Sequence, residues 1–330
     1  MKPSILVSDT HLGLYKSSDL YHNITLNLFK EIVDTCVRRN IKRIIHLGDF
    51  FDNRRHINVK TLYIAFQIAE LLKNFEVFII IGNHDTFYRD KILPTSLSVF
   101  EEHPNIKVID KVTKVDDVLM VPWGVNITDV PDVDVLFGHF EINGFPVVKG
   151  MDFFKAEIGI NNFNRFEKVY SGHFHIPSHR NNITYLGAPF QSNFGDAGSD
   201  RGYYILENNQ LEFIKYKNAP EFVIITTDDK VKPDRIKGNI VKLVYRKDYG
   251  GSENNKILEN IQIYNPIQLF TDFGRISTPQ VDGSVQETGE LIQLKSNREI
   301  LMEYIDKVSI PDHIKINTLK QFVYGLLKED

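Results

Sequence analysis

Five short apolar runs, each followed closely by aspartate, histidine or asparagine, constrain this chain more than any other feature. Runs of this length predict buried strands. Apolar residues at helical spacing over 22–40 and 59–69 separate the first three runs. A repeated strand-helix-strand order predicts an α/β fold whose sheet is parallel at its centre. The five runs cover residues 3–8, 41–47, 77–81, 133–137 and 168–171.

Polar side chains follow every one of these runs, where open α/β sheets place their chemistry. Asp9 and His11 are two residues apart, so both side chains point the same way if the backbone stays extended. One histidine or Gly-Asp pair at a strand end is more often a hydrogen-bonded turn residue, but here all five strand ends carry such groups. The candidate ligands and acid-base groups are Asp9, His11, Asp49, Asn83, His84, His139, His173 and His175.

This mixture of carboxylate, imidazole and amide groups is typical of sites for divalent manganese, iron or zinc. Two such ions about 3.5–4 Å apart hold the oxygens of a phosphate ester and lower the pKa of a bound water to about 7. The leaving oxygen then needs a proton, which an imidazole committed to a metal is unable to supply. We therefore expect phosphoester hydrolysis, with one histidine left free as the general acid.

Composition excludes several other classes of protein. Cys36 is the only cysteine, which rules out an internal disulfide and a thiolate zinc site, and its apolar helical face favours core packing. No stretch approaches the roughly 18 consecutive apolar residues of a membrane span. The first residues lack the long apolar segment of a signal peptide, so we expect a cytoplasmic protein. The net charge of −4 leaves polyanion binding to local basic patches or bound cations.

The ordered motifs SDTHLG, GDFFD, GNHD, GHFE and GHFH resemble those of the calcineurin-like metallophosphoesterase superfamily. Within it, the segments GHFEINGFPVVKGM and YSGHFHIPSHRNNITYLGAPFQSNFGDAGSDRGYYILE look like the SbcD-type nucleases, the meiotic recombination eleven family, and most nearly their tailed-bacteriophage branch. The resemblance is strong over residues 1 to about 215. It implies a β-sandwich flanked by helices and a two-metal phosphodiesterase that acts on DNA.

The resemblance also implies a role for each candidate. Two divalent ions, manganese or else magnesium, share Asp49 as a ligand. His84 is implied to be the unligated catalytic imidazole, held by Asp52, while Asp85 braces the loop. The other ligands divide into two sets, with one ion held by Asp9, His11 and His175 and the other by Asn83, His139 and His173.

The implied function is that of a manganese-dependent DNA nuclease subunit in an SbcCD-like complex for double-strand break repair and recombination. Its activities are expected to be a 3′ to 5′ exonuclease on duplexes and an endonuclease on single strands. If the protein is viral, it works in the cytoplasm of a bacterial host. The layout predicts a nuclease domain at 1–218, a small α+β capping domain at 219–265, a linker at 266–289 and a helical pair at 290–330.

Contacts with DNA and with a partner protein are expected on loops and in the last forty residues. A solvated surface charge is the plain alternative for each basic residue, and packing on the capping domain is the alternative for the terminal helices. The expected DNA contacts are Arg54, Arg55, Lys60, Lys149 and Arg180. An apolar seam is expected to dock an SbcC-like ATPase of the SMC type through Leu291, Leu294, Leu301, Ile305, Leu319, Phe322 and Val323.

The family also implies a homodimer of nuclease domains. We expect its interface on the helix from Val59 to Leu72 and on the helix containing Leu97 and Phe100.

Three rival functions use similar residues. A protein phosphatase of the same superfamily is disfavoured because Asp52-Asn53-Arg54 replaces the expected DRG. A small-molecule phosphodiesterase keeps the metals but has little need for a linker and a helical tail. A catalytically silent clamp for DNA ends has no need of intact ligands or of His84.

Overall fold

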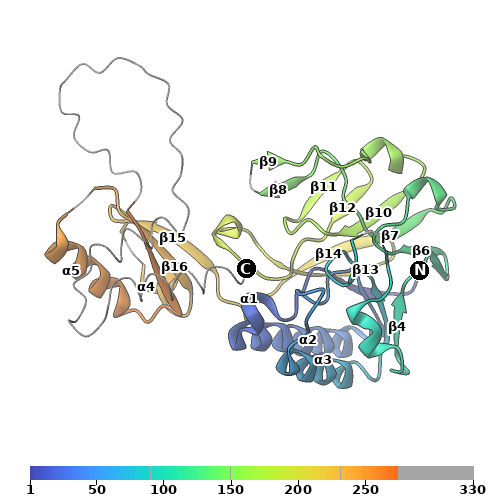
Figure 1. Cartoon of the computed structure of the whole chain (residues 1–330), viewed down its shortest axis with the longest axis horizontal. Helices are drawn as coiled ribbons and strands as arrows, with labels where there is room; N and C mark the ends of the chain where they lie inside the picture. The colour runs from blue at the N-terminus through green and yellow to red at the C-terminus, as the bar shows by residue number, and fades with distance from the viewer. Residues whose placement is uncertain (90, 149, 231, 248, 274–330) are drawn as a thin grey trace, which may run out of the picture. The chain divides into compact units, whose positions relative to one another are not determined.

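The computed structural model describes residues 1–273 apart from 90, 149, 231 and 248. Two six-stranded sheets pack face to face, and two long helices, α2 (Asp19–Arg39) and α3 (Val59–Leu71), cover the outer face of the first sheet (Figure 1). The Asn58 side chain caps α3 by accepting a hydrogen bond from the Lys60 amide. The α/β class and the helix-flanked sandwich predicted from the sequence are confirmed.

The first sheet has the strand order β14-β13-β1-β2-β3-β4. Strands β1 to β4 are parallel, and β13 and β14 complete the sheet in antiparallel order. Because β1, β2 and β3 are parallel, their carboxyl ends lie at the same edge of the sheet. The strands are β1 (Ser4–Val7), β2 (Arg43–His46), β3 (Glu76–Ile80), β4 (Ile106–Ile109), β13 (Gly202–Glu207) and β14 (Gln210–Lys215).

The second sheet has the order β11-β12-β10-β7-β6-β5 and is also parallel at its centre. Gly172 at the end of β10 lies opposite His139 at the end of β7, so these two strands finish level with each other. The strands are β5 (Thr113–Val115), β6 (Val118–Val121), β7 (Val135–His139), β10 (Lys168–Gly172), β11 (Ser178–Arg180) and β12 (Ile183–Tyr185).

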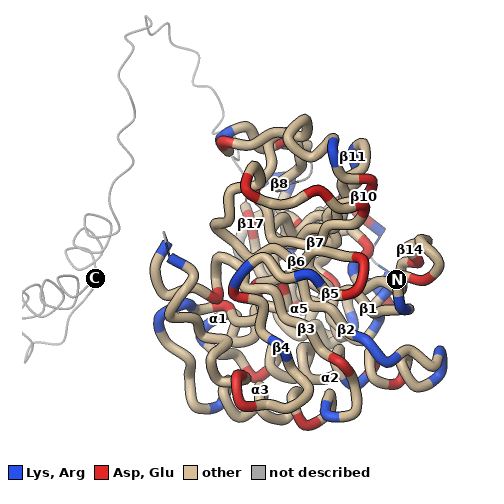
Figure 2. Tube along the Cα trace, turned by 90° about the vertical axis from the view of Figure 1, so that its right-hand side faces the viewer, with Lys and Arg blue, Asp and Glu red and all other residues tan. Residues whose placement is uncertain are grey.

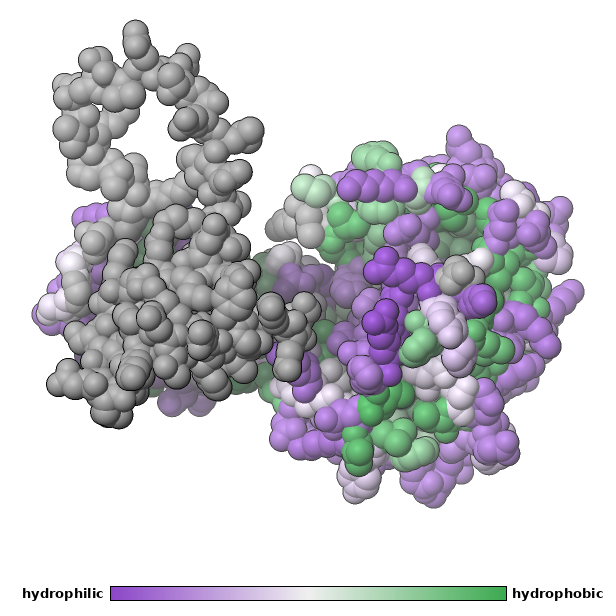
Figure 3. All heavy atoms as spheres, in the orientation of Figure 1, coloured by the Kyte–Doolittle hydropathy of each residue, from purple (hydrophilic) through white to green (hydrophobic). Residues whose placement is uncertain are grey.

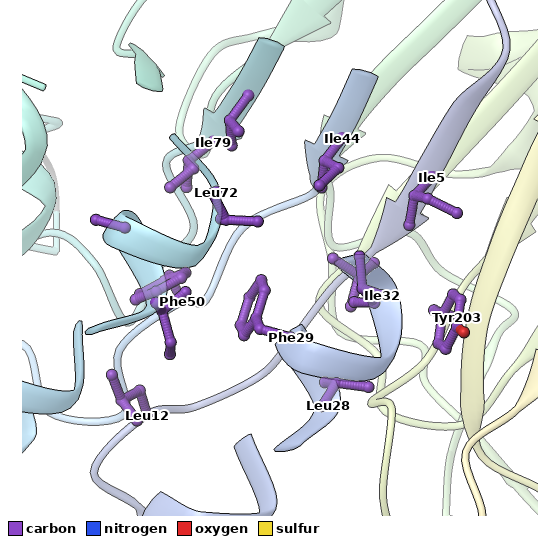
Figure 4. Close-up of a cluster of buried hydrophobic side chains, with 14 of the residues drawn as sticks. Ile5, Leu12, Leu28, Phe29, Ile32, Ile44, Phe50, Leu72, Ile79 and Tyr203 are labelled. Carbon is purple, nitrogen blue, oxygen red and sulfur yellow. The ribbon is translucent and has the colours of Figure 1, made fainter. Parts of the chain in front are cut away.

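Three apolar cores follow from this layering. The first joins the outer face of the first sheet to α2 and α3, where Phe29, Ile32 and Ile44 are fully buried (Figure 4). The second lies between the sheets, where Ile80 meets residues such as Phe137. The third covers the outer face of the second sheet with loops and short helices. Cys36 lies in the first core, and burial raises the pKa of its thiol to about 12, so it is packing rather than a reactive group.

Short elements lie between the main strands and helices. They are α1 (Leu14–Ser17), η1 (Ser96–Phe100), η2 (Ile127–Asp129), η3 (Ile160–Phe163), η4 (Phe194–Asp196) and the paired strands β8 (Pro146–Val148) and β9 (Met151–Asp152).

Lysine, arginine and acidic residues are interspersed along the described chain (Figure 2). None of the helices in the described residues is long and apolar enough to cross a membrane.

A small parallel sheet with its own apolar core follows the sandwich in the chain. Its last strand, β17, pairs with β16 inside the stretch that was expected to be linker from residue 266, so that boundary is wrong. The Gly, Pro and Asp residues around this five-residue strand give the stretch the composition of a linker. The elements are β15 (Phe222–Thr226), α4 (Pro233–Ile236), β16 (Ile240–Val244), α5 (Gly251–Gln262) and β17 (Gln268–Asp272).

Candidate metal centre

The polar residues predicted at the five strand ends come together at one place between the two sheets. Three groups of side chains there have ligand atoms within 4.8 Å of one another. We call Asp9, His11 and His175 the first half-site. We call Asp49, His139 and His173, together with Asn83, the second half-site. A third group overlaps the first half-site and consists of His11, Asp52 and His84.

Asp49 lies between the half-sites. Its Oδ2 atom is 3.7 Å from His11 Nε2 and 3.4 Å from His139 Nε2. Its other oxygen, Oδ1, accepts a hydrogen bond from the His84 amide at 2.8 Å. One carboxylate therefore faces both half-sites and also fixes the start of the His84 loop.

In the second half-site, the Asn83 side-chain oxygen is the meeting point. His139 Nε2 lies 3.0 Å and His173 Nδ1 lies 2.9 Å from Asn83 Oδ1. On its far side the His139 ring donates from Nδ1 to the Leu47 carbonyl at 2.7 Å, which leaves the Nε2 atom facing Asn83 and Asp49.

The first half-site is simpler. His11 Nε2 and His175 Nε2 face each other at 3.0 Å. Asp9 accepts the His173 amide, at 3.0 Å, and the adjacent Ser8 hydroxyl. Within the described residues, His11 Nδ1 is buried without a hydrogen-bond partner. Two imidazole nitrogens at this distance share at most one proton, and once that proton is lost both lone pairs are available to a cation placed beside them.

Several of these residues have a backbone that side chains rarely adopt. The φ angles are 52° for Asp9, 42° for His11, 55° for Asp49 and 97° for His173, all in the left-handed region. Such strain costs about 1–3 kcal/mol per residue and persists where the surroundings enforce it. Here the Asp9 amide donates to Gly48 and the His11 amide donates to Asp49, so the loops after β1 and β2 hold each other.

The glycines of the motifs are required by close approach of the ligands. A Cβ atom on Gly82 would lie 2.2 Å from Asp49 Oδ1. A Cβ atom on Gly172 would lie 2.1 Å from Ser8 Oγ. These distances are far inside van der Waals contact, which explains why glycine directly precedes the candidate ligand in GNHD and GHFH.

The electrostatics of the centre suit a bound cation. Burial holds the pKa of His11 well below its ordinary value, so its ring is neutral and its lone pair free. Burial opposes charge on His139 as well, but the adjacent Asp49 carboxylate outweighs it and raises the pKa of His139 to about 9. Two buried carboxylates surrounded by imidazoles and an amide oxygen form a donor set that fits divalent ions of borderline hardness.

His84 differs from the other histidines of the site. Its Nδ1 atom lies 2.7 Å from the backbone carbonyl of Asp52, and its ring packs edge-on against His11 at 4.7 Å between centroids. Since a carbonyl only accepts, Nδ1 carries the hydrogen. The sequence predicted that Asp52 holds this ring, and the contact is made by the main chain: the Asp52 carboxylate instead points at His11, with Oδ1 3.6 Å from Nδ1. Burial raises the pKa of Asp52.

Asp85 ties the loops together. Its buried carboxyl group accepts hydrogen bonds from the amides of Gly82, Phe50 and Phe51 at 2.9–3.3 Å. Burial and the nearby Asp49 charge raise the pKa of Asp85 to about 7. The residue joins the GDFF loop to the GNHD loop, which is the bracing position inferred from the sequence.

Two residues of the site were missed by the sequence prediction. Glu141 Oε1 lies 3.4 Å from His173 Nε2, on the side of the ring away from Asn83. Trp123 packs on the same ring with centroids 5.1 Å apart. Glu141 stands two residues after His139 in the GHFE motif, and that spacing is the signal that marks it; Trp123 follows β6 with no comparable signal.

The predicted DNA contacts lie in different surroundings. Arg54 and Arg55 line a hollow together with Phe87, Tyr88 and Arg89. Lys60 forms an ion pair with Asp19, and Arg180 forms one with Asp152 at 2.9 Å, so both charges are already matched within the chain. Lys149 and all seven predicted docking residues between 291 and 323 lie outside the described residues.

A strand-end centre of carboxylates, imidazoles and an amide, set between two sheets beside a histidine with a free ring nitrogen, defines a metal-dependent phosphoesterase. Residues 3–224 match the family of calcineurin-like phosphoesterases, and the chain belongs to that family.

Two curated relatives are similar in sequence. Exonuclease subunit 1 of Enterobacteria phage T4 is 26% identical over 345 aligned residues, which cover 93% of this chain and 92% of that protein. The DNA double-strand break repair protein Mre11 of Sulfolobus acidocaldarius is 30% identical over 114 residues, which cover 32% of this chain and 28% of that protein.

Solved structures include a nuclease from Pseudomonas putida, with 17% identity, a TM-score of 0.34, and coverage of 64% of this chain and 87% of that chain. A dimetal phosphatase from Danio rerio has 10% identity, a TM-score of 0.37, and coverage of 62% and 91%.

Proposed function

We propose that this protein is the nuclease subunit of an SbcCD-like complex that processes DNA ends for repair and recombination. The observation that carries the proposal is the division of the strand-end residues into two ligand groups around Asp49, next to His84. The similarity to Exonuclease subunit 1 of phage T4 runs along 93% of this chain and supports a nuclease, and the shorter match to the DNA double-strand break repair protein Mre11 supports DNA as the substrate.

In this proposal Asp9, His11, Asp49 and His175 hold one divalent ion, and Asp49, Asn83, His139 and His173 hold the other. Manganese is the favoured ion, because it tolerates imidazole donors better than magnesium does; magnesium, which prefers oxygen donors, is the alternative. When bound, the ions polarise the phosphodiester and activate water. The ligand residues orient the ester by the positions of their side chains, and His84 gives a proton to the leaving oxygen.

His84 is the proposed general acid. Its Nδ1 hydrogen is bound to the Asp52 carbonyl, so in the protonated ring the proton to be given away sits on Nε2. After the transfer, the neutral ring keeps the same hydrogen bond. No reorientation is needed between the two protonation states, which is the benefit of a positioned acid.

The experiment compares leaving groups. Wild-type protein with manganese should degrade linear duplex DNA from its ends. His84→Ser should lower this rate by about 10²–10⁴-fold, but should lower hydrolysis of thymidine 5′-p-nitrophenyl phosphate far less, because nitrophenolate leaves without a proton. A wild-type protein that hydrolyses only small phosphoesters would mean a small-molecule phosphodiesterase. A wild-type protein that binds DNA ends and hydrolyses nothing would mean a silent clamp.

Polarity is tested on the same material. We propose a 3′ to 5′ exonuclease on duplexes and an endonuclease on single strands, in the cytoplasm, which is that of a bacterial host if the protein is viral. Duplexes protected by phosphorothioates at the 3′ ends should resist degradation, whereas 5′ protection should have no effect. Circular single-stranded DNA should be cut.

We also propose a homodimer through α2 and α3. The α3 side chains Val59, Tyr63 and Phe66 are 83%, 60% and 50% exposed, and apolar side chains gather over this face (Figure 3). A hollow of about 670 Å³ lies there between Leu26 and Phe66. The short helix η1, which contains Leu97 and Phe100, is the second proposed contributor; these two side chains are buried in the core at 0% and 1% exposure, so η1 would contribute through its exposed Ser98. Light scattering of Phe66→Glu should show a monomer; a monomeric wild type would contradict the proposal.

The terminal helices are proposed to dock an SbcC-like ATPase of the SMC type. The relative in phage T4 is named as a subunit, which supports a partner protein. Deleting residues 290–330 should abolish co-purification with that ATPase and leave manganese-dependent hydrolysis intact. Association that survives the deletion would mean that the helices pack on the capping domain instead.

A further inference from the structure

A hollow of about 450 Å³ is lined by residues that lie close in sequence to those of the candidate metal centre. It is formed by two loops that also carry parts of the site: one follows Asp52, whose carbonyl binds His84, and the other begins three residues after His84. Its volume is in the range of about 300–1,000 Å³ that small ligands occupy. The residues lining it are Arg54, Arg55, Phe87, Tyr88 and Arg89.

The three arginines of this hollow have no ion pair with any described residue. Elsewhere in the described chain, Arg39, Arg165 and Arg180 each pair with a carboxylate at 2.8–2.9 Å. Three guanidinium groups with no carboxylate among the described residues that line the hollow form a local positive field that favours an anion, and their planar forks suit phosphate oxygens.

The two aromatic residues complete the hollow. Phe87 and Tyr88 are 41% and 48% exposed, with ring centroids 4.8 Å apart at an angle of 81°. Their loop is anchored, since the Phe87 amide donates to the Pro94 carbonyl at 3.0 Å and the preceding Thr86 is buried. Exposed aromatic rings on a fixed backbone, next to phosphate-binding groups, offer a surface on which a nucleobase stacks.

We propose that this hollow binds one unpaired nucleotide, with its base against Phe87 and Tyr88 and its phosphates against the arginines. The inference rests on the proposed function, because it names the form of DNA that approaches the centre. A base inside a duplex has both faces covered by its neighbours, so it has no face to offer these rings. The subsite therefore selects a frayed or single-stranded end and holds it next to His84.

The experiment measures binding without catalysis. Full-length protein in EDTA is titrated with a fluorescein-labelled oligothymidylate and with an oligonucleotide of the same length made of abasic sites. Wild type should bind the thymidine strand about tenfold more tightly, as expected for one stacked base. The double variant Phe87→Leu with Tyr88→Leu keeps apolar bulk at both positions and should lose this preference. Phe154→Ala, which removes a side chain that is 71% exposed elsewhere, is the matched control and should keep it.

The arginines are tested separately. Arg55→Gln with Arg89→Gln should weaken binding of both oligonucleotides and reduce the salt dependence of binding, while Arg39→Gln should change neither. Wild type that binds the two oligonucleotides equally, or a leucine variant that keeps the preference, overturns the subsite. DNA degradation by wild type in manganese is scored independently, so a failed subsite with active nuclease is distinct from a failed nuclease assignment. Thermal unfolding of each variant confirms that it is folded.

Discussion

The two half-sites are built from similar residues but are held very differently. In the second, His139 is fixed from behind by the Leu47 carbonyl and His173 by Glu141. In the first, the Asp52 carboxylate lies 3.6 Å from the buried Nδ1 atom of His11, beyond hydrogen-bond distance, and Nδ1 has no hydrogen-bond partner among the described residues. The ring of His175 hydrogen-bonds only to His11 there. Outer partners of this kind fix the tautomer and orientation of a ligating imidazole. We therefore expect the second half-site to retain its ion and the first to exchange it.

The largest effect is expected from Asp49, which faces both half-sites. Asp49→Asn should lower hydrolysis of both DNA and a nitrophenyl phosphodiester by at least about 10³-fold and lower the affinity for both ions. Calorimetric titration with manganese measures the latter. The exposed Asp129→Asn is the control. If Asp49→Asn weakened only one binding event, Asp49 would belong to one half-site alone, and the two half-sites would have separate carboxylates.

His84 comes next, because it is proposed to hold no ion. His84→Asn should lower DNA cleavage by about 10²–10⁴-fold while both manganese binding events stay unchanged. By contrast, Asn83→Ala should weaken the second binding event. Loss of metal from the His84 variant would mean that His84 is a metal ligand.

A matched pair of substitutions tests the difference between the half-sites directly. After dialysis without metal, wild-type protein should keep about one ion per chain, since only one half-site is braced. His175→Ala should keep that ion and His173→Ala should lose it, as measured by inductively coupled plasma mass spectrometry. The opposite pattern would show that bracing does not decide retention here.

Glu141 tests the same difference between the half-sites, with a smaller expected effect. Glu141→Gln keeps the size of the side chain but weakens its hold on the His173 ring, so manganese affinity at the second half-site should fall about 10–100-fold. Glu167→Gln, on the same sheet but away from the centre, should have no effect. An unchanged affinity in Glu141→Gln would mean that Trp123 packing alone orients His173.

The smallest effect is expected from His46, which lies under the first half-site, and it is an effect on stability rather than on activity. Its Nε2 atom bonds the Thr10 hydroxyl at 3.0 Å, and burial lowers the pKa of His46 to about 3. The folded pKa is below the unfolded value, so the stability it contributes is present above pH 6.5 and is lost as the pH falls toward 3. In EDTA, the free energy of unfolding should fall between pH 6.5 and 4.5 by about 2–3 kcal/mol less in His46→Gln than in wild type. Urea unfolding measures this, and parallel pH profiles would contradict it.

Much of the centre could be predicted because its residues are marked locally. A ligand such as Asp49 follows an apolar run within two residues, and parallel strands bring such positions to one edge whatever the details of packing. The glycines add to the signal because close approach forbids any side chain at Gly82 or Gly172. The fold class followed from the same strand-helix alternation.

What could not be predicted depends on contacts between distant segments. Helical spacing shows that Leu97 lies on an apolar face but not whether a core or a second molecule covers it. The helix α5 was missed, because only Ile257, Leu258 and Ile261 mark its apolar face in an otherwise polar sequence. The left-handed backbone of His173 is likewise imposed by its surroundings, since histidine has no local preference strong enough to require it.

The hydrogen bond from His84 to the main chain at position 52 has an evolutionary consequence. Every amino acid brings a carbonyl oxygen, so no single substitution at this position removes the acceptor. As far as His84 is concerned, the side chain there can change among descendants while the ring keeps its orientation. Saturation mutagenesis of position 52 should accordingly show a broad tolerance that positions 49 and 84 lack.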